Sequence, residues 1–191
     1  WYDHLEQFFI TPERALFPLN FGLSRSAGLL AHGRLFDDRL QYAAGGYDGH
    51  LVGVADNNST RDMVGYLNAR PFANSERFPL LRNFNVGISG YVGQQIRPQQ
   101  PLPLRTSLQS SENDEAAELA SSIFLRANED VFLLGNHNAS ALHVAWYARG
   151  FSLEVEWQGG RDHYQRAGTA SQVSVPVTGS HYTLSYFLTG E

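Results

Sequence analysis

The sequence predicts an all-β fold, an antiparallel up-and-down meander of strands, and three observations carry this prediction. Apolar and polar residues alternate over seven separate segments, which is the pattern of strands with one dry and one wet face. Glycine and aromatic residues are frequent, with 18 Gly and 13% aromatic, whereas patterns of helical period are scarce. The connections between the segments alternate between short and long. A chain of 191 residues is long enough to bury a core, so nothing in it demands disorder.

The first two segments meet in the stretch "HGRLFDDRLQYAAG" at 32–45, where a tight polar turn at 36–38 separates them. One face of this hairpin carries His32, Arg34, Arg39 and Gln41, and the other carries Ala31, Gly33, Leu35, Leu40, Tyr42 and Ala44. The same alternation recurs around a tight reversal at 149–150, where Glu154 and Glu156 share the polar face. The segments expected to be strands are 24–35, 39–47, 61–72, 82–94, 139–148, 151–159 and 172–188.

The connections point to the environment of these strands. In chain order they are short (36–38), long (48–60), fairly short (73–81), very long (95–138), short (149–150) and medium (160–171). Tight turns at one end and extended loops at the other are typical of a transmembrane β-barrel of the outer membrane, whose apolar faces point outward to lipid. A soluble β-barrel or sandwich that binds a ligand such as a carbohydrate is the alternative, with the apolar faces inward. Because bacterial barrels close with an even number of strands, we expect an incomplete barrel.

Two loops are expected to carry short helices. In residues 1–23, Thr11 suits a helix N-cap, Pro12 the first helical position and Pro18 a stop. In the connection 95–138, the stretch "ENDEAAELASSIFL" at 112–125 has apolar residues at helical spacing and acids at its start.

Composition excludes several classes of function. No window has 18 consecutive apolar residues, so no helix is expected to span a membrane. The chain has no cysteine, and its net charge of -5 argues against nucleic-acid binding by phosphate neutralisation. His137 and His143, six residues apart, favour a hydrated strand entry over a metal pair, and no serine lies in a GxSxG context. We therefore expect no enzyme activity, metal or cofactor.

The stretch "FITPERALFPLNFGLSRSAGLLAHGRLFDDRLQYAAGGYDG" at 9–49 resembles the middle of the phosphate-selective porin family, the porin O and P type of Gram-negative envelopes. The resemblance is carried by Glu13-Arg14, by the Arg25-Ser26-Ala27-Gly28 strand start and by the hairpin from Gly33 to Gly45. Further similar stretches are "RDMVGYLNARPF" at 61–72, "AWYARGFSLEVEWQGG" at 145–160 and "SYFLTGE" at 185–191.

The resemblance implies a fold and a location. That family forms sixteen-stranded trimeric channels, so residues 1–191 would be a single porin-like segment that supplies about seven strands. Residues 1–23 would be the loop that folds into the pore, and residues 24–191 would be barrel strands and loops. The implied location is the bacterial outer membrane, where the chain would contact lipid as a homotrimer and allow passive diffusion of small inorganic or organic anions, including phosphate.

A channel of this kind needs charged groups at its constriction and no reacting group. All 14 basic residues of the chain are arginine, so anions would be bound by planar, permanently charged guanidinium groups. The pore-lining candidates are Arg14, Arg25, Arg34, Arg39 and Arg70, with Glu13 as the counter-charge at the constriction. The family is known for lysine ligands to phosphate, which this chain lacks, and Glu154 and Glu156 add negative charge. A less selective channel, or one for organic anions or small oligosaccharides, therefore stays open.

Overall fold

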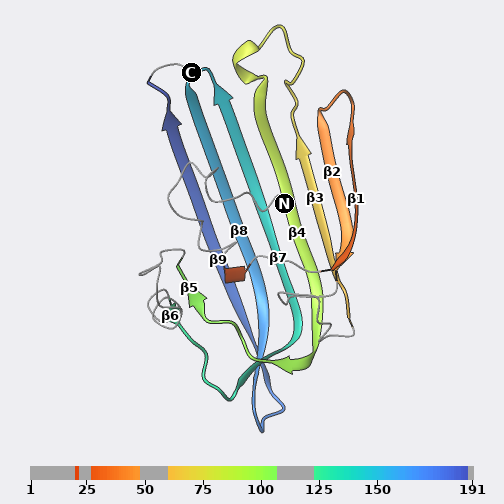
Figure 1. Cartoon of the computed structure of the whole chain (residues 1–191), viewed down its shortest axis with the longest axis vertical. Helices are drawn as coiled ribbons and strands as arrows, with labels where there is room; N and C mark the ends of the chain where they lie inside the picture. The colour runs from red at the N-terminus through yellow and green to blue at the C-terminus, as the bar shows by residue number, and fades with distance from the viewer. Residues whose placement is uncertain (1–19, 22–26, 48–59, 107–122, 189–191) are drawn as a thin grey trace, which may run out of the picture.

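The structure is a computed structural model that describes residues 20–21, 27–47, 60–106 and 123–188. These residues form a seven-stranded antiparallel sheet in the order β1-β2-β3-β4-β7-β8-β9 (Figure 1). The strands are β1 (Gly28–Leu35), β2 (Leu40–Tyr47), β3 (Asp62–Ala69), β4 (Asn83–Gln99), β7 (Val131–Ala148), β8 (Phe151–Arg166) and β9 (Gln172–Tyr186). Within the described sheet, β1 and β9 are the two edges. The predicted all-β antiparallel meander is confirmed, and each of the seven expected segments overlaps one of these strands.

Three strands are longer than their predicted segments. β4 continues to Gln99, β7 begins at Val131 and β8 continues to Arg166, where the predictions were 94, 139 and 159. The stretches added to β7 and β8 lack alternation, because 131–134 is apolar on both faces and 161–163 is polar on both. The pattern that marks a strand in a sequence therefore covers only part of each of these strands. The pairing of β8 with β9 is unbroken up to Gln165. Their connection is therefore 167–171 rather than 160–171, and the alternation of short and long connections fails at this point.

The two helices expected in the loops lie mostly outside the described residues. Residues 1–19 and 107–122 lie outside the described residues, but 123–125, the end of the expected helix, form strand β6 (Ile123–Leu125). β6 pairs with β5 (Leu104–Arg105) in a separate two-stranded sheet, so this end of the prediction is wrong. Backbone pairing with a distant segment overrides the local helical spacing there. The connection between β3 and β4 carries one short 3₁₀ helix, η2 (Pro79–Leu81). None of the described helices is long and apolar enough to cross a membrane.

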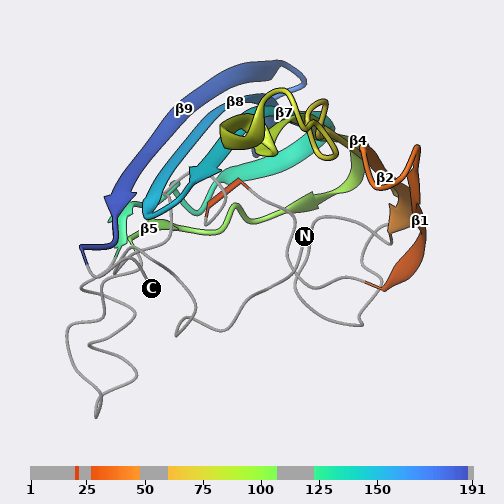
Figure 2. The same cartoon turned by 90° about the horizontal axis from the view of Figure 1, so that it is seen from above.

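The sheet is strongly curved, and its two faces differ in chemistry. Figure 2 shows the short red segment 20–21 beneath the arc of the strands, on its concave side. The phenol of Tyr91 on β4 donates a hydrogen bond to the carbonyl of Phe21 (2.8 Å), so the face that bears Tyr91 is the concave one. The strand register extends this face across the sheet, with Val64 paired to Tyr91 and Ala139 paired to it on the other side.

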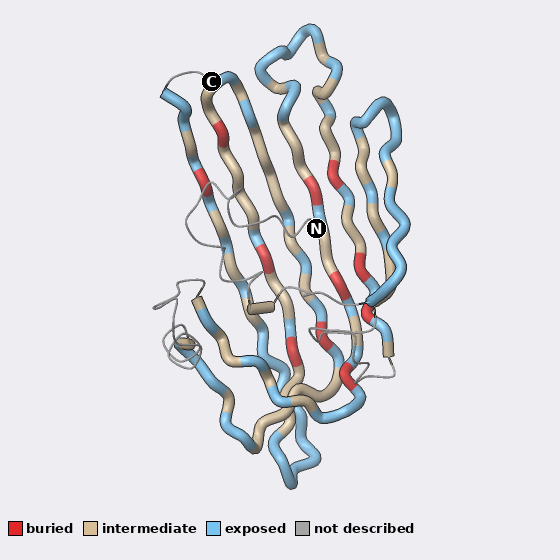
Figure 3. Tube along the Cα trace, in the orientation of Figure 1, coloured by how far each residue is buried: buried red, intermediate tan, exposed pale blue. Residues whose placement is uncertain are grey.

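The buried residues of the described strands are marked red in Figure 3, and by the strand register their side chains all lie on the concave face. Val64 and Tyr91 are the two buried apolar residues, and the polar ones are Asp62, Asn68, Gln95, His137, Ser152, Gln158, Asp162 and Thr183. The convex face instead exposes large apolar side chains, with Trp157 at 66% and Leu184 at 69%. Leu40, Val86, Val144 and Leu153 on the convex face are only partly covered and form no dry interior. A soluble sandwich would have the opposite arrangement.

Candidate functional site

A buried polar bridge crosses three neighbouring strands on the concave face. Asp62 begins β3 and His137 lies on β7, with β4 between them. Nε2 of His137 lies 2.9 Å from Oδ2 of Asp62, and both side chains are buried, that of Asp62 completely. The two meet over Gly93 of β4, where a Cβ atom would overlap both the carboxylate and the imidazole. Only a residue without a side chain allows this contact, so we call the trio the Asp–Gly–His bridge.

A second bridge of the same design lies further along the same strands. Nε2 of His143 on β7 lies 3.2 Å from Oδ1 of Asn68 on β3, above Gly87 of β4. A Cβ at Gly87 would overlap the ring of His143. We call this trio the Asn–Gly–His bridge. Asn68 Nδ2 also lies 3.4 Å from Oδ1 of Asn85. Each member is six residues from its counterpart in the first bridge. Because strand side chains return to one face every second residue, both bridges share the concave face, about 20 Å apart.

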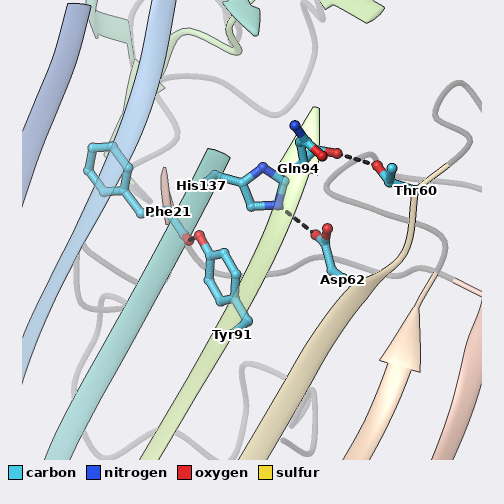
Figure 4. A network of polar contacts seen from close by, with 6 residues as sticks. All are labelled: Phe21, Thr60, Asp62, Tyr91, Gln94 and His137. Atoms are coloured by element: carbon cyan, nitrogen blue, oxygen red, sulfur yellow. Dashed lines mark hydrogen bonds and ion pairs between the residues drawn. The ribbon is translucent and has the colours of Figure 1, made fainter. Parts of the chain in front are cut away.

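The Asp–Gly–His bridge joins a wider network (Figure 4). The ring of Tyr91 lies beside that of His137, with 5.9 Å between centroids, while its hydroxyl binds the carbonyl of Phe21. Next to Phe21, the side chain of Asn20 donates to the carbonyl of Arg105 (2.9 Å) and accepts from its N–H (2.8 Å). The pair Asn20–Phe21 is thus bound to the sheet on one side and to β5 on the other. Among the described residues, Asp62 Oδ1 has no hydrogen-bond partner.

Acidic and imidazole side chains continue the polar surface onto β8 and β9. Glu154 accepts a hydrogen bond from the hydroxyl of Tyr147 (2.5 Å). Glu156 is paired in register with His143 on β7 and with His181 on β9. With Asp62 and Asp162, these two glutamates place four carboxylates on the concave face of the described strands. Arg34 on β1 and Arg166 at the end of β8 lie on the same face, and Arg166 forms an ion pair with Asp130, so carboxylates outnumber arginines there.

A shallow pocket lies at the ends of β4, β7 and β8, where these strands extend beyond the shorter strands β1, β2 and β3. The polar residues of its lining are Gln95, Gln99, Asn136, His137, Asp162 and His163, and the others are Leu133, Leu134 and Gly135. Gly135 has a φ of 113°, which suits glycine, at an irregularity in the β7–β8 ladder.

Burial and then the neighbouring Asp162 carboxylate raise the pKa of Tyr164 to about 12. No cluster of three His, Asp or Glu able to hold a metal ion occurs in the described part of the chain.

Of the arginines predicted to line a pore, those that the structure describes lie away from the two bridges. Arg14, Arg25 and their counter-charge Glu13 are outside the described residues. Arg34 is on the concave face of β1, 66% exposed, and forms an ion pair with Asp38 (3.6 Å). Arg39 is exposed in the β1–β2 turn, and its carbonyl accepts a hydrogen bond from the N–H of Arg70 (2.7 Å). Since Arg70 follows the last residue of β3 and Asp62 is the first, these arginines gather at the end of the sheet opposite the Asp–Gly–His bridge.

Sequence reasoning missed both histidines as members of a site. It placed His137 and His143 at a hydrated strand entry, whereas the structure places both inside β7, with His137 buried. A signal exists in the sequence. The heptapeptides "DMVGYLN", "GISGYVG" and "HNASALH" begin and end with Asx, Gly and His respectively. That spacing acquires meaning only when the three strands are known to be neighbours in register.

Comparison of the chain with family models, with curated proteins and with solved structures finds no match.

Proposed function

We propose that this chain forms part of the wall of an outer-membrane porin, a passive diffusion channel of the phosphate-selective porin type. The observation that carries the proposal is the inverted distribution of side chains between the two faces. Polar groups are buried on the concave face, and large apolar side chains are exposed on the convex face. A wall between lipid and water needs this arrangement, because lipid covers the apolar face and water hydrates the other.

The height of the apolar surface supports the same proposal. On the convex side of β8, apolar residues alternate from Phe151 to Trp157, and Arg161 then interrupts them. Including Gly159, this stretch of nine residues is about 20 Å tall for a strand rising ~3.3 Å per residue and tilted ~40°. Outer-membrane barrels have apolar bands of ~25 Å. Trp157 lies toward one border of this band, and Phe151 with its cross-strand partner Tyr186 lies toward the other, as aromatic girdles do.

The solutes we propose are small inorganic or organic anions, phosphate among them. Arg34, Arg39 and Arg70 would supply guanidinium groups near the mouth at the short turns. Arg14 and Arg25 would add theirs from residues outside the described ranges. The channel would work without a reacting group or cofactor, and the trimeric state and the outer-membrane location belong to the same proposal.

A second solute class follows from the charge of the wall. Asp62, Asp162, Glu154 and Glu156 face the concave side, and a ring of carboxylates favours cations or leaves a wide pore without strong preference. The sign of the preferred ion therefore depends on whether the arginines or these acids lie at the narrowest point.

Conductance in a planar lipid bilayer tests the proposal. We expect the full-length protein, with all the strands of its barrel, to need detergent for extraction and to produce stepwise conductance. A reversal potential measured in a salt gradient then gives the ion sign, and added phosphate should lower chloride conductance if anions are preferred. Replacing Glu154 and Glu156 by Gln should shift the reversal potential toward anions. A protein that stays in solution without detergent and produces no conductance would contradict the porin and favour a soluble β-fold that binds a ligand.

A further inference from the structure

Three turns lie together at one end of the sheet and carry an excess of arginine. They are 36–39, 70–82 and 149–150, at the top of Figure 1. Together they hold five arginines and three acids, a net charge of +2 in a chain whose net charge is -5. The arginines are Arg39, Arg70, Arg77, Arg82 and Arg149. Within the described ranges, none of these five forms an ion pair, and one of the acids, Asp38, is already paired with Arg34. We call these turns the arginine rim.

The longest turn of the arginine rim folds over the convex face. The indole N–H of Trp146 donates to the carbonyl of Leu80 in η2 (2.8 Å). Phe72 packs edge-on against Phe78 and against Phe84 of β4, with centroids 6.0 and 6.2 Å apart. Trp146 and Phe84 are both convex-face residues, paired in register. The turn therefore extends the apolar band, and Phe78 and Leu80 stay 43% and 51% exposed at its border.

Two arginines stand directly beside this apolar border. The guanidinium carbon of Arg77 lies 5.3 Å from the ring centroid of Phe78. Nε of Arg82 donates to the carbonyl of Ser75 (2.9 Å), which orients its planar group and leaves the Nη atoms available. Cationic groups thus lie next to exposed apolar side chains, on the side of the sheet that would face lipid.

We infer that the arginine rim binds the headgroups of anionic phospholipids, with Arg77 and Arg82 at the phosphodiester and Phe78 and Leu80 against the first acyl carbons. This inference rests on the proposed porin function, because it needs the convex face to lie in a bilayer. Guanidinium groups match phosphate oxygens in bidentate geometry, and arginine near an anionic membrane surface is favourable. A free anion in solution would gain nothing from Phe78 and Leu80, so the geometry favours a lipid over dissolved phosphate.

Lipid retention by the purified full chain tests this inference. Detergent-solubilised protein is titrated with phosphatidylglycerol or with phosphatidylcholine, and bound lipid is counted by native mass spectrometry. We expect tighter binding of phosphatidylglycerol, weakened about fivefold for each arginine removed in R77Q/R82Q. R77K/R82K keeps both charges and should retain most of the preference. R97Q/R161Q removes two exposed arginines at the other end of the sheet and serves as the matched control.

Three outcomes would overturn the inference: unchanged phosphatidylglycerol binding in R77Q/R82Q, an equal loss in R97Q/R161Q, or full competition by water-soluble glycerol phosphate. The last result would identify a site for a free anion. Conductance of R77Q/R82Q is measured in parallel and should match that of the unmodified chain. Absence of conductance in both proteins would contradict the porin itself, whereas normal conductance without a lipid preference would contradict only the arginine rim.

Discussion

The two bridges on the concave face have the same backbone geometry and different side-chain chemistry. In both, a histidine on β7 reaches an Asx residue on β3 above a glycine of β4. The Asp–Gly–His bridge is buried and contains a carboxylate, whereas the Asn–Gly–His bridge contains a neutral amide and a half-buried His143. The comparison teaches that glycine provides the space, and that charge and burial decide how much each bridge contributes to stability.

Adding a side chain at Gly93, the glycine of the Asp–Gly–His bridge, should have the largest effect on stability. We expect G93A to lower the free energy of unfolding by about 3 kcal/mol, because the new methyl group would separate a buried carboxylate from its histidine. Urea unfolding of the protein in detergent micelles measures this. G65A is the matched control, since a Cβ at Gly65 of β3 would meet nothing within 4 Å. Equal losses in both variants would mean that strand glycine itself, rather than the bridge, is required.

Replacing each histidine in turn by alanine should separate the contribution of the buried charge from that of the shared bridge geometry. H137A leaves the fully buried carboxylate of Asp62 without its partner, and we expect a loss of about 3 kcal/mol. H143A leaves a neutral amide that keeps its contact with Asn85, and we expect about 1 kcal/mol. Thermal unfolding of both variants under the same conditions gives the comparison. If H143A proves as costly as H137A, burial of charge is not what distinguishes the bridges.

Replacing Asp62 by Asn gives the first bridge the side-chain chemistry of the second, and it should destabilise the protein less than the loss of His137. D62N keeps an oxygen that accepts a hydrogen bond from His137 and removes the buried charge, so we expect a loss of about 1 kcal/mol. The double variant D62N/H137A should then be less destabilised than the sum of its two single variants. Additive losses, measured by the same urea titration, would show that Asp62 and His137 stabilise the sheet independently.

The smallest effect is expected at the connection between the bridge and Phe21. Y91F removes the hydroxyl that donates to the carbonyl of Phe21 and keeps the ring beside His137. We expect a loss of about 0.5 kcal/mol in calorimetric unfolding. Y182F is the control, because Tyr182 is 69% exposed on the convex face. A change in Y182F as large as that in Y91F would argue against the network as the cause.

The alternation of apolar and polar residues determined much of the fold. A period of two places side chains on opposite faces of a strand, so Leu40 and Tyr42 were separable from Gln41 before any strand was paired. The same signal located all seven strands of the sheet. It did not locate the start of β7 or the end of β8, because 131–134 is apolar on both faces and 161–163 is polar on both, so neither stretch alternates.

Only the tertiary structure decided which face is concave and which side chains meet across it. His137 and Asp62 are 75 residues apart, and their contact depends on the register of two strand pairs and on a glycine between them. Likewise, Ile123 joined a strand because a partner 18 residues earlier offered backbone hydrogen bonds. Local patterns record the chemistry of single residues, whereas contacts between distant strands depend on pairing and curvature that no single segment contains.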